Sequence, residues 1–134
     1  MSVRIEGIHE LLNDLEQRLG QKRMQQVSDT ALKAGADVFV KELIYQIESA
    51  GDKGYAKGYT VDEVTVTEPF DEGGVRTIKV HWRGPHNRYR LIHLNEYGTV
   101  HNPNPPRKGR IAKALKNAES AYREAIAKAV REGI

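Results

Sequence analysis

Four histidines lie close together in the sequence and are the residues best suited to bind a metal ion. They fall between residues 81 and 101 with one glutamate among them, as His81, His86, His93, His101 and Glu96. A zinc site needs three or four such ligands to converge. No pair has the HxxxH or HExxH spacing that places two ligands on one helix face. The sequence therefore favours packed or surface histidines, and neither a metal ion nor another cofactor is expected.

Other catalytic patterns are also missing from the sequence. There is no cysteine, which excludes thiol catalysis, thiolate metal sites and disulfides. No serine lies in a GxSxG elbow, and no GxGxxG or GxxxxGK[ST] loop occurs. Paired carboxylates at Asp62-Glu63 and Asp71-Glu72 are typical of turns and solvent-facing positions. The sequence predicts a protein that is not an enzyme, and a metal-dependent nuclease ranks last among the alternatives.

A Gly-rich segment at residues 51–59 combines basic and aromatic side chains, namely Lys53, Tyr55, Lys57 and Tyr59. Such residues can follow a phosphate backbone and stack on bases. Tyrosine is also enriched in protein interfaces, so the segment could instead order on a protein partner. A solvated loop is the favoured reading, and the two binding readings stay open.

The C-terminal segment is the basic part of the chain. Residues 107–134 carry eight Lys and Arg against three Glu, which gives +5 and leaves −2 for the first 106 residues of a chain with net charge +3. A nucleic-acid interface is possible. Because both signs are mixed along the segment, a solvated helix face is the simpler reading. Lys113, Lys116 and Arg123 are the candidate docking residues there, chosen by charge alone.

The sharpest local feature is the run Glu96-Tyr97-Gly98-Thr99. The glycine indicates a positive φ or a close backbone contact. A partly buried Glu96 would need hydrogen bonds or a cation. We interpret the run as a structural turn with a satisfied acid, which serves to position the last helix.

Length and composition predict one soluble domain over residues 1–134. A chain of 134 residues can bury one core, and 29% of its residues are charged against 39% hydrophobic. No apolar run approaches the roughly 18 residues that span a bilayer. The charges within the N-terminal apolar pattern argue against a secretory signal.

The apolar spacing predicts the elements that must position these residues. Helical periodicity runs from Ile5 to Leu19, and again from about Gln21 to about Ala50. Residues 61–67 and 75–83 read as an antiparallel hairpin, and residues 89–96 as a short helix or, less well, a strand. A last helix begins at about Arg107, and its expected apolar stripe consists of Ile111, Leu115, Ala118, Tyr122, Ala125, Ile126 and Ala129. The expected class is α+β, with two N-terminal helices and a C-terminal helix packed on a small antiparallel β-sheet and a flexible loop at about 51–60.

Two segments then give the chain a family resemblance. One matches an H-L-x-E-[YF]-G-T pattern at His93, Leu94, Glu96, Tyr97, Gly98 and Thr99. The other has a proline, glycine, apolar and alanine pattern at Pro106, Gly109, Ile111 and Ala114. With the two N-terminal helical patterns before them, their order and spacing resemble the siphophage tail-completion proteins, which join head to tail.

The resemblance implies a structural role in the virion without catalysis. Such a protein is made as a soluble monomer in the host cytoplasm and forms a ring, usually a hexamer, at the head-proximal end of the tail. The ring would contact the head-completion (stopper) protein on one side and the tail tube protein on the other. Genomic DNA would pass through its channel, and no membrane is involved.

One departure limits what transfers from the family. Many relatives carry Thr-Gly-x-Leu after the long helix, where this chain has Lys57-Gly58-Tyr59-Thr60, so loop contacts are not carried over. We expect residues 51–59, and also 102–108, to become ordered only on assembly, since they combine Gly or Pro with charged and aromatic residues. The alternative function is a small basic nucleic-acid-binding module.

Overall fold

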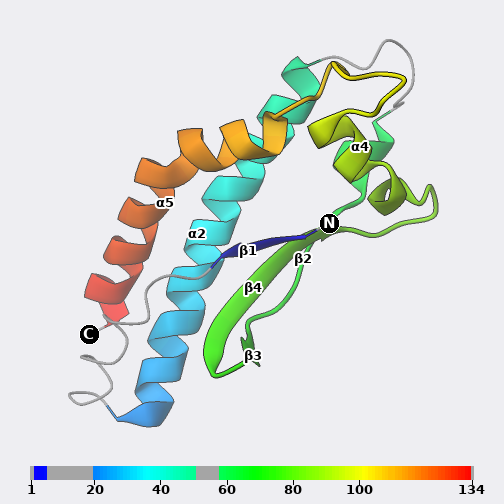
Figure 1. The fold of residues 1–134 in the computed structure, drawn as a ribbon. Coiled ribbons are helices and arrows are strands. Elements are labelled where there is room, and N and C mark those ends of the chain that lie inside the picture. The colour runs from blue at the N-terminus through cyan, green and yellow to red at the C-terminus, as the bar shows by residue number, and fades with distance from the viewer. Residues whose placement is uncertain (1, 6–19, 51–57, 134) are drawn as a thin grey trace.

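A computed structural model describes residues 2–5, 20–50 and 58–133 (Figure 1). Its elements in chain order are β1 (Val3–Ile5), α2 (Gln21–Ser49), α3 (Tyr59–Asp62), β2 (Val64–Val66), β3 (Phe70–Glu72), β4 (Val75–Trp82), the 3-10 turn η1 (Arg88–Arg90), α4 (Ile92–Tyr97) and α5 (Arg110–Gly133). The predicted α+β class is confirmed, since helices pack on a small antiparallel sheet.

Strand β4 is the centre of the sheet, and the other three strands pair antiparallel with it. β1 opposes residues 78–80, β2 opposes residues 80–82, and β3 opposes residues 75–77. The turn between β3 and β4 is Gly73-Gly74, with φ of 58° and 83°. A two-residue hairpin turn of this kind needs positive φ at both positions, which glycine adopts without strain. The predicted antiparallel pairing is confirmed for residues 64–66 with β4. Val61 instead belongs to α3, and Asp71-Glu72, expected in a turn, belong to the strand β3, which was not predicted.

The predicted start of the first helix, at Ile5, is wrong. Val3–Ile5 form the edge strand β1, with Val3 opposite Val80 and Ile5 opposite Ile78. β-branched residues at both ends of this strand suit a pleated surface. The remainder of that expected helix, residues 6–19, lies outside the described residues.

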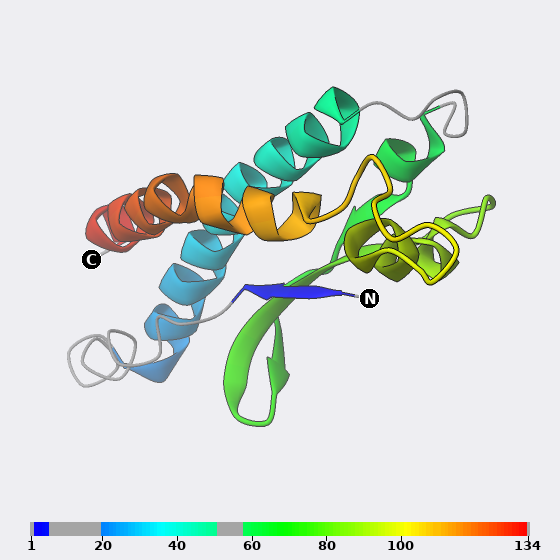
Figure 2. The same cartoon turned by 45° about the horizontal axis from the view of Figure 1, so that its top comes forward.

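Helix α2 is the core helix, and its predicted extent is confirmed. It packs against β4 through one set of side chains and against α5 through another (Figures 1 and 2). The largest fully buried side chains include Phe39, Leu32 and Leu43 on α2 with Ile78 and Val80 on β4. Burial of each such side chain contributes about 1.5–3 kcal/mol. The core therefore holds β4 and α5 against the same helix.

Helix α5 starts at Arg110, three residues after the predicted start, and runs beside α2 in both views (Figures 1 and 2). A Cβ at Gly35 would lie 3.0 Å from Ile126 Cδ1, so the absence of a side chain there permits close contact between the helices. Leu115, expected in the apolar stripe, is 39% exposed, and the fully buried Ala114 lies in the core instead. A small residue suits this narrow interface.

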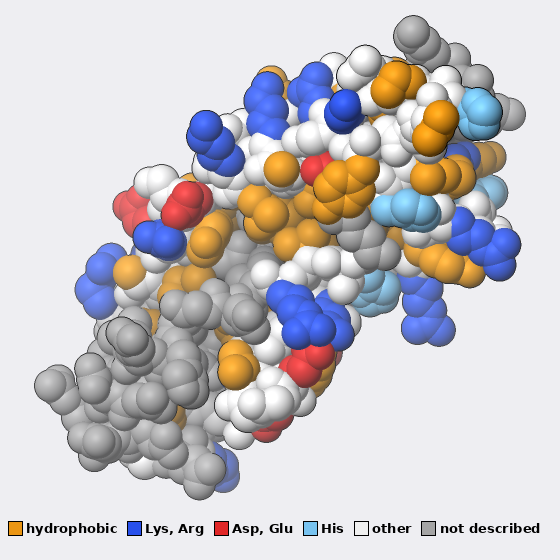
Figure 3. Space-filling model, in the orientation of Figure 1, with side chains coloured by type: hydrophobic (Ala, Val, Ile, Leu, Met, Phe, Trp, Pro, Cys, Tyr) orange, Lys and Arg blue, Asp and Glu red, His pale blue; other side chains and the backbone are white. Residues whose placement is uncertain are grey.

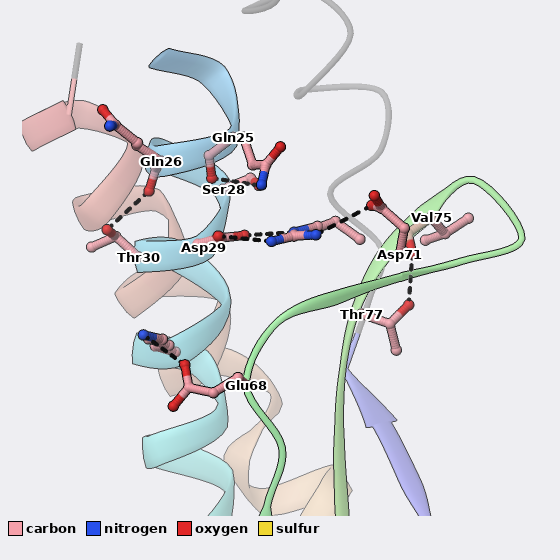
Figure 4. A network of polar contacts seen from close by, with 11 residues as sticks. Gln25, Gln26, Ser28, Asp29, Thr30, Glu68, Asp71, Val75 and Thr77 are labelled. Carbon is pink, nitrogen blue, oxygen red and sulfur yellow. Dashed lines mark hydrogen bonds and ion pairs between the residues drawn. The ribbon is translucent and has the colours of Figure 1, made fainter. Parts of the chain in front are cut away.

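A polar cluster also connects α2 to β4 (Figure 4). Arg76 Nε and Nη2 donate to the two carboxylate oxygens of Asp29 at 2.7 and 3.0 Å, and Arg76 Nη1 lies 3.5 Å from Asp71 Oδ1. This bidentate geometry is the strong form of an arginine–carboxylate pair. The hydrogen bond to Asp29 raises the pKa of Arg76 above its ordinary value. This contact fixes the end of β4 that is farthest from α4.

Glu42 makes a second polar connection, between α2 and α5. Its Oε1 accepts from Gln46 Nε2 at 2.8 Å and from Asn117 Nδ2 at 3.1 Å. The hydrogen bond from Gln46, and then that from Asn117, lower the pKa of Glu42 from its ordinary 4.5. The folded state therefore binds a proton at Glu42 less readily than the unfolded chain does.

This lowered pKa gives a pH-dependent prediction. A carboxyl whose folded pKa is depressed stabilises the fold above its unfolded pKa, and the contribution disappears as the pH falls through the folded pKa. Glu42→Gln should therefore destabilise the protein near pH 7 by about 1 kcal/mol or less, because solvent screens the contacts of Glu42 with Gln46 and Asn117. Near pH 3 the loss of stability should be smaller. Urea unfolding at both pH values measures this. A difference from wild type that grows on acidification would contradict it.

Candidate partner-docking site

Glu96 caps the N-terminus of α5 from a different helix. Its Oε1 accepts from the Ile111 N–H at 2.8 Å and its Oε2 from the Ala112 N–H at 3.1 Å. Gly109, which precedes the helix, also donates its N–H to the Glu96 carbonyl at 2.9 Å. The side chain of the residue before a helix normally accepts from the second and third helical N–H groups. Gly109 has no side chain, so the Glu96 carboxylate takes this role. The carboxylate also stabilises the positive end of the helix dipole.

Gly98 ends α4 in a conformation that other residues rarely adopt, with φ 81° and ψ 176°. A Cβ there would lie 2.5 Å from the Pro103 carbonyl oxygen. Beyond it, Thr99 donates its N–H to the Asn102 carbonyl and its Oγ1 accepts from the Asn102 N–H, both at 2.9 Å. Lys108 Nζ donates to the same Pro103 carbonyl at 2.8 Å. The Pro-rich link is therefore folded back against the end of α4.

These contacts bear on two expectations. The Glu96 carboxylate is 6% exposed, and both its oxygens accept hydrogen bonds from the first turn of α5. This agrees with the interpretation of a turn that positions the last helix. Residues 102–108, expected to become ordered on assembly, already make hydrogen bonds within the chain. Their ordering on assembly stays a prediction.

A second buried carboxylate holds the segment that leads into η1. Glu63 is 2% exposed, and its Oε1 and Oε2 accept from the N–H groups of Arg88 at 3.0 Å and His86 at 2.9 Å. A Cβ at Gly84 would lie 2.4 Å from Glu63 Cγ. The expectation of a solvent-facing Glu63 is wrong, because backbone N–H groups more than twenty residues away supply its partners. Asp62, the other residue of this pair, is exposed as expected.

The residues predicted for the 51–60 loop divide into two groups. Lys53, Tyr55 and Lys57 lie outside the described residues. Tyr59 and Thr60 belong to α3, so the predicted loop is too long at this end. The Tyr59 ring stacks on His86 with centroids 3.5 Å apart, and Thr60 is buried at 2% exposure.

Thr60 ties two distant segments together. Its carbonyl accepts from Trp82 Nε1 at 3.1 Å, and its Oγ1 accepts from Arg107 Nη1 at 3.0 Å. Trp82 ends β4, whereas Arg107 lies in the link before α5. The predicted loop residue thus joins the sheet to the start of the last helix.

The remaining predicted site residues are exposed. Lys113 and Lys116 lie in the first turns of α5, near its capped end. Arg123 lies farther along and pairs with Glu119 at 2.9 Å. His93 on α4 is exposed, whereas Glu96 of the same helix is buried. The structure therefore does not bring Arg123 to the segment that carries the Glu96-Gly98 turn.

An apolar patch that was not predicted from the sequence lies on η1, α4 and the residues that follow α4. We define the apolar patch by five residues, which are Tyr89 (44% exposed), Leu91 (40%), Leu94 (37%), Tyr97 (66%) and Val100 (94%). The threefold spacing of Leu91, Leu94 and Tyr97 places them on one side of the helix. Ile92 and Glu96 on the other side are buried. Helical spacing in the sequence could have indicated this patch, because it places Leu91 and Leu94 on a different side of the helix from Ile92.

The same part of the chain is strongly basic. Residues 83–116 contain eight Lys and Arg and one acid, Glu96, which gives 8 − 1 = +7. The rest of the chain has 13 basic and 17 acidic residues, or −4. In Figure 3, hydrophobic, histidine and basic side chains gather at the upper right, where α4 lies in Figure 1. Because Glu96 is buried against α5, the surface of this segment carries almost only positive charge.

Comparison with protein-family models, with curated proteins and with solved structures finds no match to this chain. In the part of the chain that the structure describes, no three His, Asp or Glu side chains are grouped so that they could hold a metal ion. None of the helices in residues 2–5, 20–50 and 58–133 is long and apolar enough to cross a membrane.

Proposed function

We propose that this protein is a virion structural protein of a tailed phage, which completes the head-proximal end of the tail and joins it to the head. One observation carries the proposal: the segment that resembles the tail-completion family forms a fixed turn whose outer side exposes the apolar patch. Glu96 and Gly98 fix the turn from within, whereas Leu94 and Tyr97 of the same segment face solvent.

A joining role accounts for a turn that is fixed by buried residues and exposes apolar side chains on its outer side. A protein that docks on a large particle needs apolar side chains at the surface, held in a defined geometry before contact. The cap on α5 and the Gly98 turn supply that geometry. The proposed partners are the head-completion (stopper) protein, the tail tube protein and further copies in a ring, six by the family resemblance, around a channel for genomic DNA. No enzymatic step is proposed.

The test is the mass of the purified protein in solution, alone and after mixing with purified tails and with DNA-filled heads from lysates that lack it. We expect a monomer of 15.1 kDa that adds to one kind of particle as a ring and restores the joining of heads to tails. A protein that attaches to neither particle would overturn the proposal.

The second candidate is a nucleic-acid-binding module, and the +7 charge of residues 83–116 favours it. Binding that depends on phosphate contacts weakens steeply as salt increases. Titration of a short DNA duplex at about 50 and about 200 mM salt separates the two functions. Tight, salt-sensitive DNA binding without attachment to particles would replace the first proposal with this one.

A further inference from the structure

We infer that the apolar patch is the surface through which the protein docks, and that its partner is a protein surface with carboxylates around exposed apolar side chains. The inference rests on the proposed function and names the docking face and the chemistry of what it meets. Three observations carry it: the exposure of the patch, three cations beside it that form no ion pair within the described residues, and ion pairs that hold acids elsewhere on the chain.

The exposure of the patch is concentrated in a short stretch. Five large apolar side chains between residues 89 and 100 are each at least 37% exposed, and Val100 is 94% exposed. Scattered exposed apolar residues are ordinary, but contiguous ones mark sites of association. Removal of this apolar surface from water would favour a complex.

Three cations near the patch form no ion pair within the described part of the chain. Arg83, exposed at the end of β4, and Lys108, exposed in the link, form no ion pair there. Arg90 likewise has none, and its Nε donates to the Tyr89 hydroxyl at 3.0 Å. Lys108 reaches the Pro103 carbonyl that packs against Gly98, so it borders the end of α4. A partner that covers the patch therefore meets positive charge at its rim, and carboxylates complement it.

A second copy of this chain is a poor source of those carboxylates. Six acids elsewhere in the described residues are held by cations of the same chain, in the pairs Asp29–Arg76, Asp37–Lys41, Glu68–Lys33, Glu72–Arg4, Glu119–Arg123 and Glu132–Lys128. A copy that used these acids to neutralise the rim would have to break their pairs. A different, acidic protein surface does not carry that cost.

Nucleic acid fits the patch less well than protein does. Leu91, Leu94 and Val100 have no aromatic face on which a base could stack. Tyr89 is already engaged by Arg90, whose guanidinium lies 5.6 Å from its ring centroid. Aliphatic and tyrosine side chains inside a polar rim are instead the composition of a protein interface.

The test uses the full chain and two patch variants. The first replaces apolar side chains (Leu94→Ser with Tyr97→Ser), and the second reverses a rim charge (Arg90→Glu). Matched controls on α2 are Tyr45→Ser, at a residue 62% exposed, and Lys22→Glu, also exposed. All these side chains are at the surface, and circular dichroism and thermal unfolding verify that each variant folds.

Affinity for purified tails and for DNA-filled heads is then measured for each variant. We expect both patch variants to bind at least about tenfold more weakly than wild type to the particle that wild type binds, with both controls within about twofold. Raising the salt should weaken wild-type binding and should narrow its difference from Arg90→Glu. Residues 89–100 should also be protected from hydroxyl radicals in the wild-type complex.

The outcomes separate the two proposals. If wild type attaches to particles while the patch variants bind as the controls do, or the footprint lies elsewhere, the docking face is wrong and the proposed function stands. If wild type attaches to neither particle, both fall. If the patch variants lose affinity for a DNA duplex and not for particles, the acidic protein partner is overturned in favour of nucleic acid.

Discussion

Glu96→Ala is expected to destabilise the protein by about 2–5 kcal/mol, because it leaves the N–H groups of Ile111 and Ala112 without their acceptor. The Ile111 N–H bond is buried, so water cannot readily replace the carboxylate there. The loss also removes a negative charge from the positive end of α5. Urea unfolding followed by circular dichroism measures the change.

Two further variants make this expectation specific. Glu96→Gln retains one acceptor oxygen but turns an amide NH₂ toward the other N–H, so it should fall between wild type and alanine. Glu119→Ala lies on the exposed side of α5, where it removes only a surface pair with Arg123, and should cost about 0.5 kcal/mol or less. Equal effects of Glu96→Ala and Glu119→Ala would show that the cap contributes nothing of note.

Gly98→Ala is expected to destabilise the protein by about 3 kcal/mol and to shift the link between α4 and α5. The backbone at φ 81° and ψ 176° lies in a region that is essentially reserved for glycine, and such strain costs about 1–3 kcal/mol. The added Cβ would also lie 2.5 Å from the Pro103 carbonyl oxygen, a backbone atom that cannot rotate away. Thermal unfolding gives the loss, and amide chemical shifts of residues 99–109 report the displacement.

Gly73→Ala is the matched control for this variant. Gly73 also has a positive φ, of 58°, but no atom lies within 4 Å of the position of an added Cβ. It should cost only the roughly 1–2 kcal/mol of a left-handed residue with a side chain. If the two variants lose equal stability, with no shift in the link, the close approach of Pro103 carries no energetic weight.

Sequence periodicity was informative wherever one face of an element is buried. The long stripe of α2 and the alternation of Ile78, Val80 and Trp82 follow directly from this rule, and both correspond to buried side chains. The rule failed at Val3–Ile5, because three residues are too few to show a period and their strand depends on pairing with β4. Leu115 was misplaced because its neighbour Ala114 fits the narrow contact in the core.

The two buried acids show the same limit for the site. Glu96 sits in a run whose glycine already indicated a fixed turn, so a satisfied acid could be predicted there. Glu63 has no such neighbour, and its partners are N–H groups at residues 86 and 88 that only the tertiary fold brings near. The apolar patch was missed for a related reason: its residues are apolar like the core, and only the helical geometry of α4 shows which side faces water.

The cap on α5 also bears on the order in which the chain folds. Most helices can start from residues in their own first turn, but the first turn of α5 uses a carboxylate 15 residues upstream of Ile111. The intervening chain must close a loop before that turn is complete, and loop closure slows such contacts relative to local ones. The middle of α5 can therefore become helical early, while its first turn forms only once α4 and the Gly98 turn are in place.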